Sequence, residues 1–203
     1  MRHLVLFALI VSVGWAAPVL GQPADSDDET LIGSVQQSGG YGAPTVAITS
    51  VNDQVAAIVG GQGGWVINNR FVIGGAARGL ASRPSTSFRG EAADVQMGYG
   101  GLLLEYIGAS SELVHYGGSV VIGGGAAHIV DEDFVDFRDD NPLNQSGFFV
   151  TEAGPWVELN VTSFFRMALG GGYRLIRGTD LRGASDDSLS GPYGRLSFRF
   201  GSF

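Results

Sequence analysis

Apolar and polar residues alternate along most of the chain after residue 42, in segments that end at turn residues. In the last of these, Leu196, Phe198 and Phe200 alternate with two arginines and a serine. A period of two is the signature of a β-strand with one apolar face. The pattern predicts strands at Ala43–Val51, Val55–Asn68, Arg70–Ala81, Val95–Ile107, Leu113–Val130, Phe148–Asn160, Phe164–Ile176 and Gly191–Phe203.

The connections between these strands differ in length in a regular way. Short ones follow the second, fourth and sixth strands, at residues 68–69, 108–112 and 161–163. Long polar ones follow the third, fifth and seventh, at residues 82–94, 131–147 and 177–190. Short turns at one end and long loops at the other are typical of transmembrane barrels. The first connection, at residues 52–54, departs from this rule because it is short where a long loop is expected.

Charged and bulky apolar side chains lie on opposite faces of the predicted strands. In the fourth strand, for example, Leu102, Leu104 and Tyr106 share one face and Glu105 lies on the other. The charged set comprises Arg78, Glu105, Glu152, Glu158, Arg166, Arg174, Arg195 and Arg199. A water-facing surface is usually about 25–35% charged, and these groups are too sparse for that. They fit an enclosed, mutually neutralising network in a barrel lumen, with the apolar face toward lipid. The predicted fold is therefore all-β, an eight-stranded antiparallel up-and-down transmembrane barrel.

Aromatic residues form two bands along the predicted barrel. The band near the short turns comprises Trp65, Phe71, Tyr106, Tyr116, Phe165 and Phe203. The band near the long loops comprises Phe149, Tyr173 and Tyr193. Aromatic girdles mark the two membrane interfaces of such barrels, although aromatic residues also favour strands in general. We interpret the first band as the membrane-interface aromatics.

The first residues of the chain predict export. Residues 1–21 combine a basic start, an apolar run from Leu4 to Ala17 and small residues near Gly21, which is typical of a secretory signal peptide. Residues 22–41 are acidic and polar and are predicted to be a flexible lead to a barrel over residues 42–203. The rest of the chain has no apolar run of about 18 residues that would make a spanning helix.

Composition narrows the function classes. The chain has 12 basic and 20 acidic residues, and without Arg2 the net charge is −9. No lysine is present, so nucleic acid is not expected as a partner and a P-loop is excluded. Cysteine is absent, which excludes a disulfide framework and a lipid-anchored cysteine. The 33 glycines lie inside apolar segments, where they leave room for bulky lumen side chains such as Arg and Trp or allow sharp curvature.

The signal peptide, the eight amphipathic strands, the absent cysteine and the final Phe together resemble the small outer-membrane barrels of the OmpA and OmpX type. The resemblance covers residues 43–203 and is one of architecture. It implies residence in the bacterial outer membrane, contact with membrane lipid and recognition of the last strand by the barrel-assembly machinery. The stretches "GGWVINNRFVIGG" and "LSGPYG" also resemble those of a group of exported proteins of unassigned function.

Two positions predict local irregularities. Phe203 is out of step with Phe198 and Phe200, so the outward aromatic face requires a bulge at Gly201–Ser202. Pro155 removes one ladder hydrogen bond from a closed sheet, which a bulge at Gly154–Pro155 would absorb.

Few residues offer chemistry. One interpretation of the charge network is a gate or narrow polar path. The other is that it only fills the lumen, because an eight-stranded lumen is only wide enough for side chains. The acidic stretch at 131–141 reads as a cation-binding loop or as a solvated one. His115 and His128 lie on opposite faces and cannot share a metal. No catalytic residue, metal or cofactor is predicted.

The sequence therefore predicts a non-enzymatic small outer-membrane barrel with a structural, adhesive or envelope-protective role. One alternative is a soluble, lipocalin-like secreted barrel that binds an apolar ligand and turns its charges to water. Another is a lipid-acting barrel enzyme, for which His128 is the candidate base. The orientation of Leu196–Phe200 separates the first two.

Overall fold

The computed structural model describes residues 38–88, 91–131, 145–181 and 183–203. The predicted signal peptide, most of the predicted flexible lead and nearly all of the acidic stretch at 131–141 lie outside these ranges. The described elements are β1 (Ser38–Val51), β2 (Gln54–Ile67), β3 (Phe71–Leu80), β4 (Ser85–Phe88), β5 (Glu91–Gly108), β6 (Val114–Asp131), β7 (Gln145–Asn160), β8 (Phe165–Arg177), α1 (Asp186–Leu189) and β9 (Gly191–Ser202).

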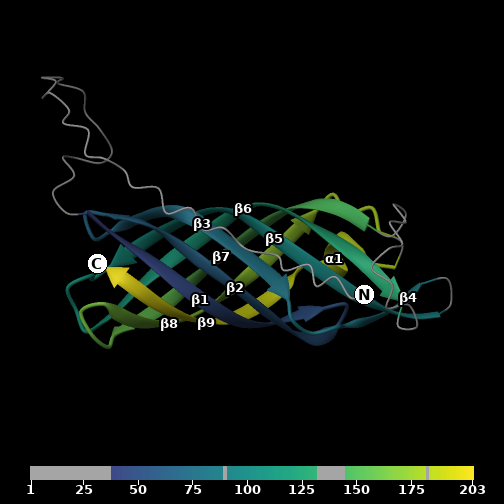
Figure 1. The fold of residues 1–203 in the computed structure, drawn as a ribbon, viewed down its shortest axis with the longest axis horizontal. Coiled ribbons are helices and arrows are strands. Elements are labelled where there is room, and N and C mark those ends of the chain that lie inside the picture. Colours follow the sequence, from purple (N-terminus) through teal and green to yellow (C-terminus); the bar gives the residue numbers. More distant parts are fainter. Residues whose placement is uncertain (1–37, 89–90, 132–144, 182) are drawn as a thin grey trace, which may run out of the picture. The chain divides into compact units, whose positions relative to one another are not determined.

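Eight of the strands close into an antiparallel barrel (Figure 1). Each strand pairs with the next along the chain, β3 pairs with β5, and β9 returns to β1, with Thr45 opposite Ser197. The ladders thus close around the ring, as a structure inside hydrocarbon requires, with short interruptions beside Pro44 and Pro155. The predicted eight-stranded antiparallel barrel is confirmed.

The strand boundaries agree with the prediction except at two places. β1 begins at Ser38, inside the segment predicted to be a flexible lead, and its first residues pair with the end of β2. On the other side of β1, Gly39 lies against the backbone of Ser202 in β9, where a Cβ atom would clash. The loop predicted at residues 82–94 contains β4, which pairs with the start of β5 at the end of the barrel that also carries α1 (Figure 1).

An Asn-Asn pair and an Asn-Asp pair form two of the tight turns between strands. Asn68 and Asn69 both have positive φ angles, of 51° and 54°, as do Asn52 and Asp53, of 51° and 60°. Two successive residues with positive φ form the hairpin turn whose twist matches that of the strands. We call the end of the barrel with Asn68–Asn69 the inner end, and the end with β4 and α1 the outer end.

The pairing register excludes both predicted bulges. Gly40, Tyr41 and Gly42 pair with Ser202, Gly201 and Phe200, and the register is the same where pairing resumes at Thr45 and Ser197. The strands β6 and β7 likewise pair without a shift at Pro155, which points outward, and β7 resumes pairing with β8 in the same register at Trp156. The prediction was wrong because it assumed that Phe203 faces outward and that the proline needs an extra residue.

Several inward-facing glycines accommodate aromatic rings. A Cβ atom at Gly117 would overlap the ring of Trp156, and one at Gly125 would lie 2.8 Å from the ring of Phe148. This agrees with the interpretation that glycines make room for large lumen side chains.

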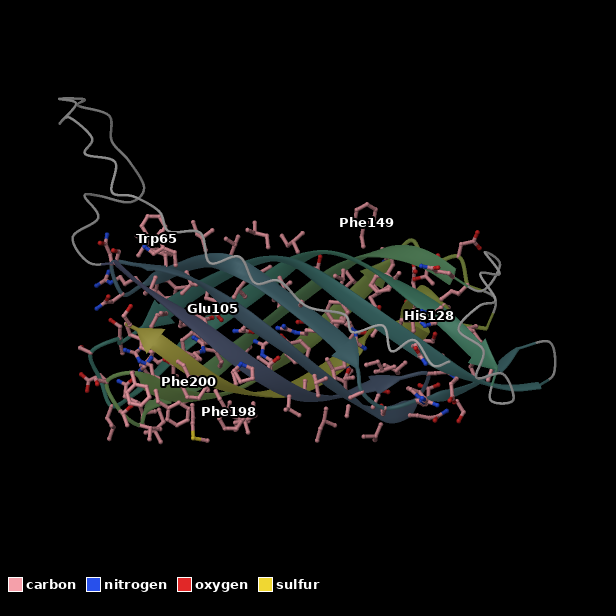
Figure 2. The ribbon with its side chains drawn as sticks, viewed as in Figure 1. Trp65, Glu105, His128, Phe149, Phe198 and Phe200 are labelled. Carbon is pink, nitrogen blue, oxygen red and sulfur yellow. The ribbon has the colours of Figure 1, made fainter. Side chains whose placement is uncertain are left out.

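The outer wall of the barrel is apolar. Large exposed hydrophobic side chains on the strands include Val46, Ile48, Val59, Trp65, Ile73, Leu102, Leu104, Tyr106, Tyr116, Ile122, Phe149, Val157, Leu159, Leu169, Tyr173, Leu175 and Phe200. In Figure 2, Trp65, Phe149, Phe198 and Phe200 point away from the barrel while Glu105 lies within it. A wall of this kind faces lipid, because in water it would far exceed the apolar patch of a soluble monomer.

The lumen has three levels. Two apolar clusters fill its ends: a large one around Val51, Val95 and Ile176 at the outer end, and a small one around Val66, Val72 and Trp156 at the inner end. Buried charged side chains lie between them.

Candidate functional site

The charged side chains of the lumen form two clusters joined by one glutamine. We call the outer charge cluster Arg78, Tyr99, Glu152, Arg174 and Arg195. We call the inner charge cluster Tyr41, Glu105, His115, Glu158, Arg166 and Arg199. All come from inward positions of their strands, so the alternation that exposes the apolar wall also buries these groups.

In the outer charge cluster, Glu152 forms two ion pairs and accepts one hydrogen bond. Arg78 Nε lies 2.9 Å from Glu152 Oε2, and Arg195 Nη1 lies 3.7 Å from the same oxygen. The Tyr99 hydroxyl donates a hydrogen bond to Glu152 Oε1. Arg195 also donates from Nη2 to Ser119 Oγ at 3.1 Å.

In the inner charge cluster, Arg199 bridges two carboxylates. Its Nη2 lies 3.0 Å from Glu105 Oε1 and its Nε lies 3.0 Å from Glu158 Oε2. His115 Nε2, at 2.8 Å, and Arg166 Nη1, at 3.3 Å, contact Glu158 Oε1. Arg166 is paired with Asn160 in the β7–β8 ladder, so its long side chain extends along the strand to contact Glu158.

Gln62 connects the two clusters. Its Nε2 donates to Glu105 Oε1 at 3.3 Å and to the Tyr41 hydroxyl at 3.2 Å, and its Oε1 accepts from Arg78 Nη2 at 3.2 Å. The Tyr41 hydroxyl in turn donates to Glu105. The polar groups thus run without a break from His115 to Tyr99.

The predicted lumen residues all lie inward, but they do not all pair with each other. Arg174 faces Glu152 across the β7–β8 ladder, yet its guanidinium donates to the carbonyl oxygens of Leu189 and Ser50. The prediction of a mutually neutralising set is therefore wrong for Arg174, because a segment that the strand pattern does not show supplies its acceptors.

The predicted interface aromatics divide into five outward residues and one inward residue. Trp65, Phe71, Tyr106 and Tyr116 are exposed near the inner end, and Phe165 stacks on Phe200 with 4.9 Å between ring centroids. Phe203 instead points into the lumen. It stacks on Tyr41 and lies under Arg166, whose Cζ is 3.8 Å from the ring centroid. The outward prediction for Phe203 was wrong because the strand register continues unbroken.

At the outer end, Phe149 and Tyr173 are exposed, whereas Tyr193 is buried in the lumen beside Arg195. Its position in the predicted outer band was wrong, since Tyr193 and Arg195 share the inward parity of β9.

Sequence reasoning missed several members of the network. Tyr99 and Ser119 share an inward parity with Glu105 and His115 of their own strands, and that parity was a usable signal. Gln62 was missed because β2 contains no charged residue that would mark its inward face. Tyr41 was missed because its strand begins earlier than predicted.

The segment between β8 and β9, residues 178–181 and 183–190, packs into the outer end of the lumen, and we call it the lid. Leu181, Ala184 and Leu189 of the lid are buried in the outer apolar cluster. Ser185 caps α1 through a reciprocal capping box with Ser188. The tight turn between β1 and β2 contacts the lid, because Asn52 N–H donates to Ser188 O at 2.7 Å. This contact gives a structural reason for the unexpectedly short first connection.

Arg174 anchors the lid, so Arg174→Met is expected to loosen it. The guanidinium is fully buried and donates to Leu189 O from Nε at 3.0 Å and from Nη2 at 2.8 Å. Hydrogen bonds from a charged group contribute about 1.5–3 kcal/mol, so proteolysis within residues 177–190 should accelerate about ten-fold or more. Limited thermolysin digestion of the folded protein in detergent measures this. The exposed Arg70→Met variant, in the turn between β2 and β3, is the control, and equal cleavage of the two variants would contradict the role.

The lid also predicts a pH dependence at Asp186. The Thr179 N–H, at 2.8 Å, and the Gly178 N–H, at 3.1 Å, donate to the Asp186 carboxylate and lower its pKa below the ordinary value. A lowered pKa in the folded state means that the stabilisation is complete at neutral pH and is lost in acid. The loss begins below the ordinary aspartate pKa of about 3.9 and is complete below the lowered one. Amide exchange at Gly178 and Thr179 should rise in that window, the rise should vanish in Asp186→Asn, and Asp187→Asn should retain it.

His128 lies outside the lumen, in the outer half of the barrel in Figure 2. Its Nε2 is 3.0 Å from Gln96 Oε1 of the neighbouring strand. Within the ranges given above, no set of three or more His, Asp or Glu side chains is arranged to hold a metal ion.

No protein-family model matches the chain, and no curated protein matches its sequence. Among solved structures, the barrel is similar to Neisserial surface protein A, with 16% identity, a TM-score of 0.50, and coverage of 81% of this chain and 96% of that one. It is also similar to the attachment invasion locus protein Ail of Yersinia pestis, with 10% identity, a TM-score of 0.47, and coverage of 81% and 97%. A third structure, the outer membrane protein OprG of Pseudomonas aeruginosa, has 13% identity, a TM-score of 0.43, and coverage of 81% and 95%.

The match to Neisserial surface protein A shows a shared fold. The orientation of the side chains shows whether the outer wall of the barrel faces water or lipid. Leu196, Phe198 and Phe200 lie on the outside, and Arg195 and Arg199 are buried within. A soluble carrier has the reverse arrangement, so the lipocalin-like alternative is not favoured. The chain has the fold and the surface of an outer-membrane β-barrel in contact with lipid. None of the helices in the described ranges is long and apolar enough to cross a membrane.

Proposed function

We propose that this protein is a non-enzymatic outer-membrane barrel with a closed lumen, which serves the cell envelope in a structural or adhesive role. The observation that carries the proposal is the filling of the lumen at every level. The lid and the outer apolar cluster occupy one end, the two charge clusters the middle, and Trp156, Tyr41 and Phe203 the other. The lumen of an eight-stranded barrel is narrow, and in this barrel side chains fill it.

The filled lumen also indicates that the charged side chains stabilise the barrel and do not line a conducting path. The guanidinium of Arg199 lies 4.8 Å from the ring centroid of Tyr41 and 4.6 Å from that of Trp156, so aromatic rings flank the ion pairs. A conducting path needs water beside the charges, whereas here Arg199 and Glu158 are 1% exposed.

The first experiment measures conductance. Purified full-length protein inserted into planar bilayers is expected to give no stable current steps. A general porin inserted under the same conditions is the positive control. Reproducible current steps from the folded protein would contradict the closed lumen and show that the barrel is a pore.

The second experiment tests the orientation and the surface role. Following the loop rule for such barrels, we place the outer end outside the cell. An epitope tag inserted at Arg83, between β3 and β4, is expected to bind antibody on intact cells. The same tag inserted at Ser110, in the turn between β5 and β6, should become accessible only after the outer membrane is permeabilised. The opposite accessibility would reverse the orientation and remove the adhesive role.

The assembly route follows from β9. Its outward face carries Leu196, Phe198 and Phe200, and we propose that the barrel-assembly machinery recognises this strand. Replacing Phe198 with Asp should deplete the protein from the outer-membrane fraction. The inward Ser197→Ala change should leave its amount unaltered.

The non-enzymatic part of the proposal has its own test. The His128→Ala variant should match the unaltered protein in any lipid-modifying assay of outer-membrane vesicles. A lipid product that depends on His128 would reassign the protein as an enzyme.

A further inference from the structure

Formal charge is distributed unevenly between the two charge clusters. The inner charge cluster contains two guanidinium groups and two carboxylates, which balance when His115 is neutral. Among the residues that the structure describes, the outer charge cluster contains Arg78, Arg174 and Arg195 but only one carboxylate, Glu152. Three positive groups against one negative group leave a formal excess of two positive charges in this cluster.

This excess is buried. Arg78 is 6% exposed, Arg195 is 4% exposed and Arg174 is fully buried. Arg174 is solvated by the carbonyl oxygens of Leu189 and Ser50, which are dipoles and do not cancel its charge. An uncompensated charge in a low-dielectric interior is strongly unfavourable, so a neutralising group is expected nearby.

All three guanidinium groups also have a terminal nitrogen outside the hydrogen-bond network. Arg78 Nη1, Arg174 Nη1 and Arg195 Nη1 are buried without a hydrogen-bond partner, although Arg195 Nη1 takes part in the long ion pair with Glu152. The Arg78 and Arg195 side chains converge on Glu152 Oε2, at 2.9 Å for Arg78 Nε and at 3.7 Å for Arg195 Nη1. Two guanidinium groups that share one carboxylate oxygen repel one another. Buried donors in folded proteins are normally satisfied, and two adjacent cations select an anion over a neutral water molecule.

We propose that the outer charge cluster binds a small inorganic anion of the size of chloride, between Arg78 and Arg195. The neighbouring side chains limit the size of the ligand, since the outer apolar cluster lies on one side and the inner charge cluster on the other. An eight-stranded lumen offers no room there for a larger organic anion. Because the lid and the inner aromatic residues close both ends, the ion enters as the barrel folds and acts as a structural component.

Bromide, which scatters anomalously, identifies the site directly. Crystals of the full-length protein grown in sodium bromide are expected to show an anomalous peak within hydrogen-bond distance of the Arg78 and Arg195 guanidinium groups. Bromide peaks confined to the outside of the barrel, or a water molecule at this position, would overturn the proposal.

Stability in solution provides a second readout. The folded protein in detergent is unfolded with urea in sodium chloride, sodium bromide or sodium gluconate at equal ionic strength. At an anion concentration of about 100 times Kd, the unfolding equilibrium constant should fall about 100-fold in chloride and bromide relative to gluconate. Identical unfolding in all three salts would contradict the site.

Matched variants assign the effect to the outer charge cluster. Arg195→Gln removes one excess charge and should abolish most of the chloride dependence. Arg166→Gln makes the same substitution in the balanced inner charge cluster and should preserve it. Equal chloride dependence in these two variants would show that the ion does not bind at Arg195.

A gain-of-charge variant completes the test. Ser119 Oγ accepts from Arg195 Nη2, so Ser119→Asp places a carboxylate where it can replace the ion. This variant should be as stable in gluconate as the unaltered protein is in chloride. If it does not fold, the comparison of Arg195→Gln with Arg166→Gln and the bromide crystal still decide the question.

Discussion

Replacing Arg199 with methionine is expected to destabilise the folded barrel by about 3–5 kcal/mol, the cost of breaking a buried ion pair by removing one partner. Arg199 holds both Glu105 and Glu158 at 3.0 Å, and all three side chains are at most 4% exposed. The variant leaves Glu105 with only neutral donors, Tyr41 and Gln62. Urea unfolding in detergent, followed by Trp fluorescence and by gel mobility without heating, measures the change.

Two comparisons separate this effect from general damage. Arg177→Met removes an exposed ion pair with Asp187, 3.5 Å long, and should leave the unfolding midpoint unchanged. Combining Arg199→Met with Glu105→Gln should recover much of the lost stability, because Glu158 keeps Arg166 and no buried carboxylate is then left without a cation. A double variant no more stable than Arg199→Met alone would show that Arg199 acts by packing against Tyr41 and Trp156.

Replacing Gly123 with alanine is expected to prevent closure of the native barrel, with a loss of about 3 kcal/mol or more. The strands β5 and β6 pair Gly101 with Gly123, and a Cβ atom at Gly123 would overlap the carbonyl oxygen of Gly100. The obstacle is backbone rather than a flexible side chain, so only separation of the two strands could relieve it. The folded, heat-modifiable band on gels should be reduced or lost.

The same barrel supplies controls for this glycine. Gly42 and Gly194 also lie within paired strands, but a Cβ atom at either position would have no other atom within 4 Å. Gly42→Ala and Gly194→Ala should fold as the unaltered protein does, or with a small gain of up to about 1 kcal/mol from the reduced freedom of the unfolded chain. If all three alanine variants assembled alike, the close approach of β5 and β6 would not be a requirement of the fold.

These two predictions concern opposite requirements of one small lumen. The ion pairs need to be complete because they are buried, and Gly123 is needed because the backbones of β5 and β6 approach too closely for a Cβ atom. The proposed anion belongs to the same logic, since it would neutralise the outer charge cluster without requiring another side chain.

The parts of this protein that follow from local sequence are the strands and their faces. The alternation in β9 places Leu196, Phe198 and Phe200 on one side and Arg195 and Arg199 on the other, whatever the rest of the chain does. The asparagine pair at 68–69 likewise selects its own turn. Since hydrocarbon contacts the whole outer wall, every strand carries the same signal, and eight repetitions of it predict a closed membrane barrel.

Contacts across the lumen were decided only in three dimensions. Arg174 binds the lid rather than Glu152, Phe203 turns inward under Arg166, and Arg78 and Arg195 converge on a single carboxylate. Parity states that a side chain points inward, but the stagger of eight strands and the packing of the lid determine which groups it meets there. The lipid-facing wall therefore follows from the local sequence of each strand, whereas the pairing of charges in the lumen is decided only when the barrel closes.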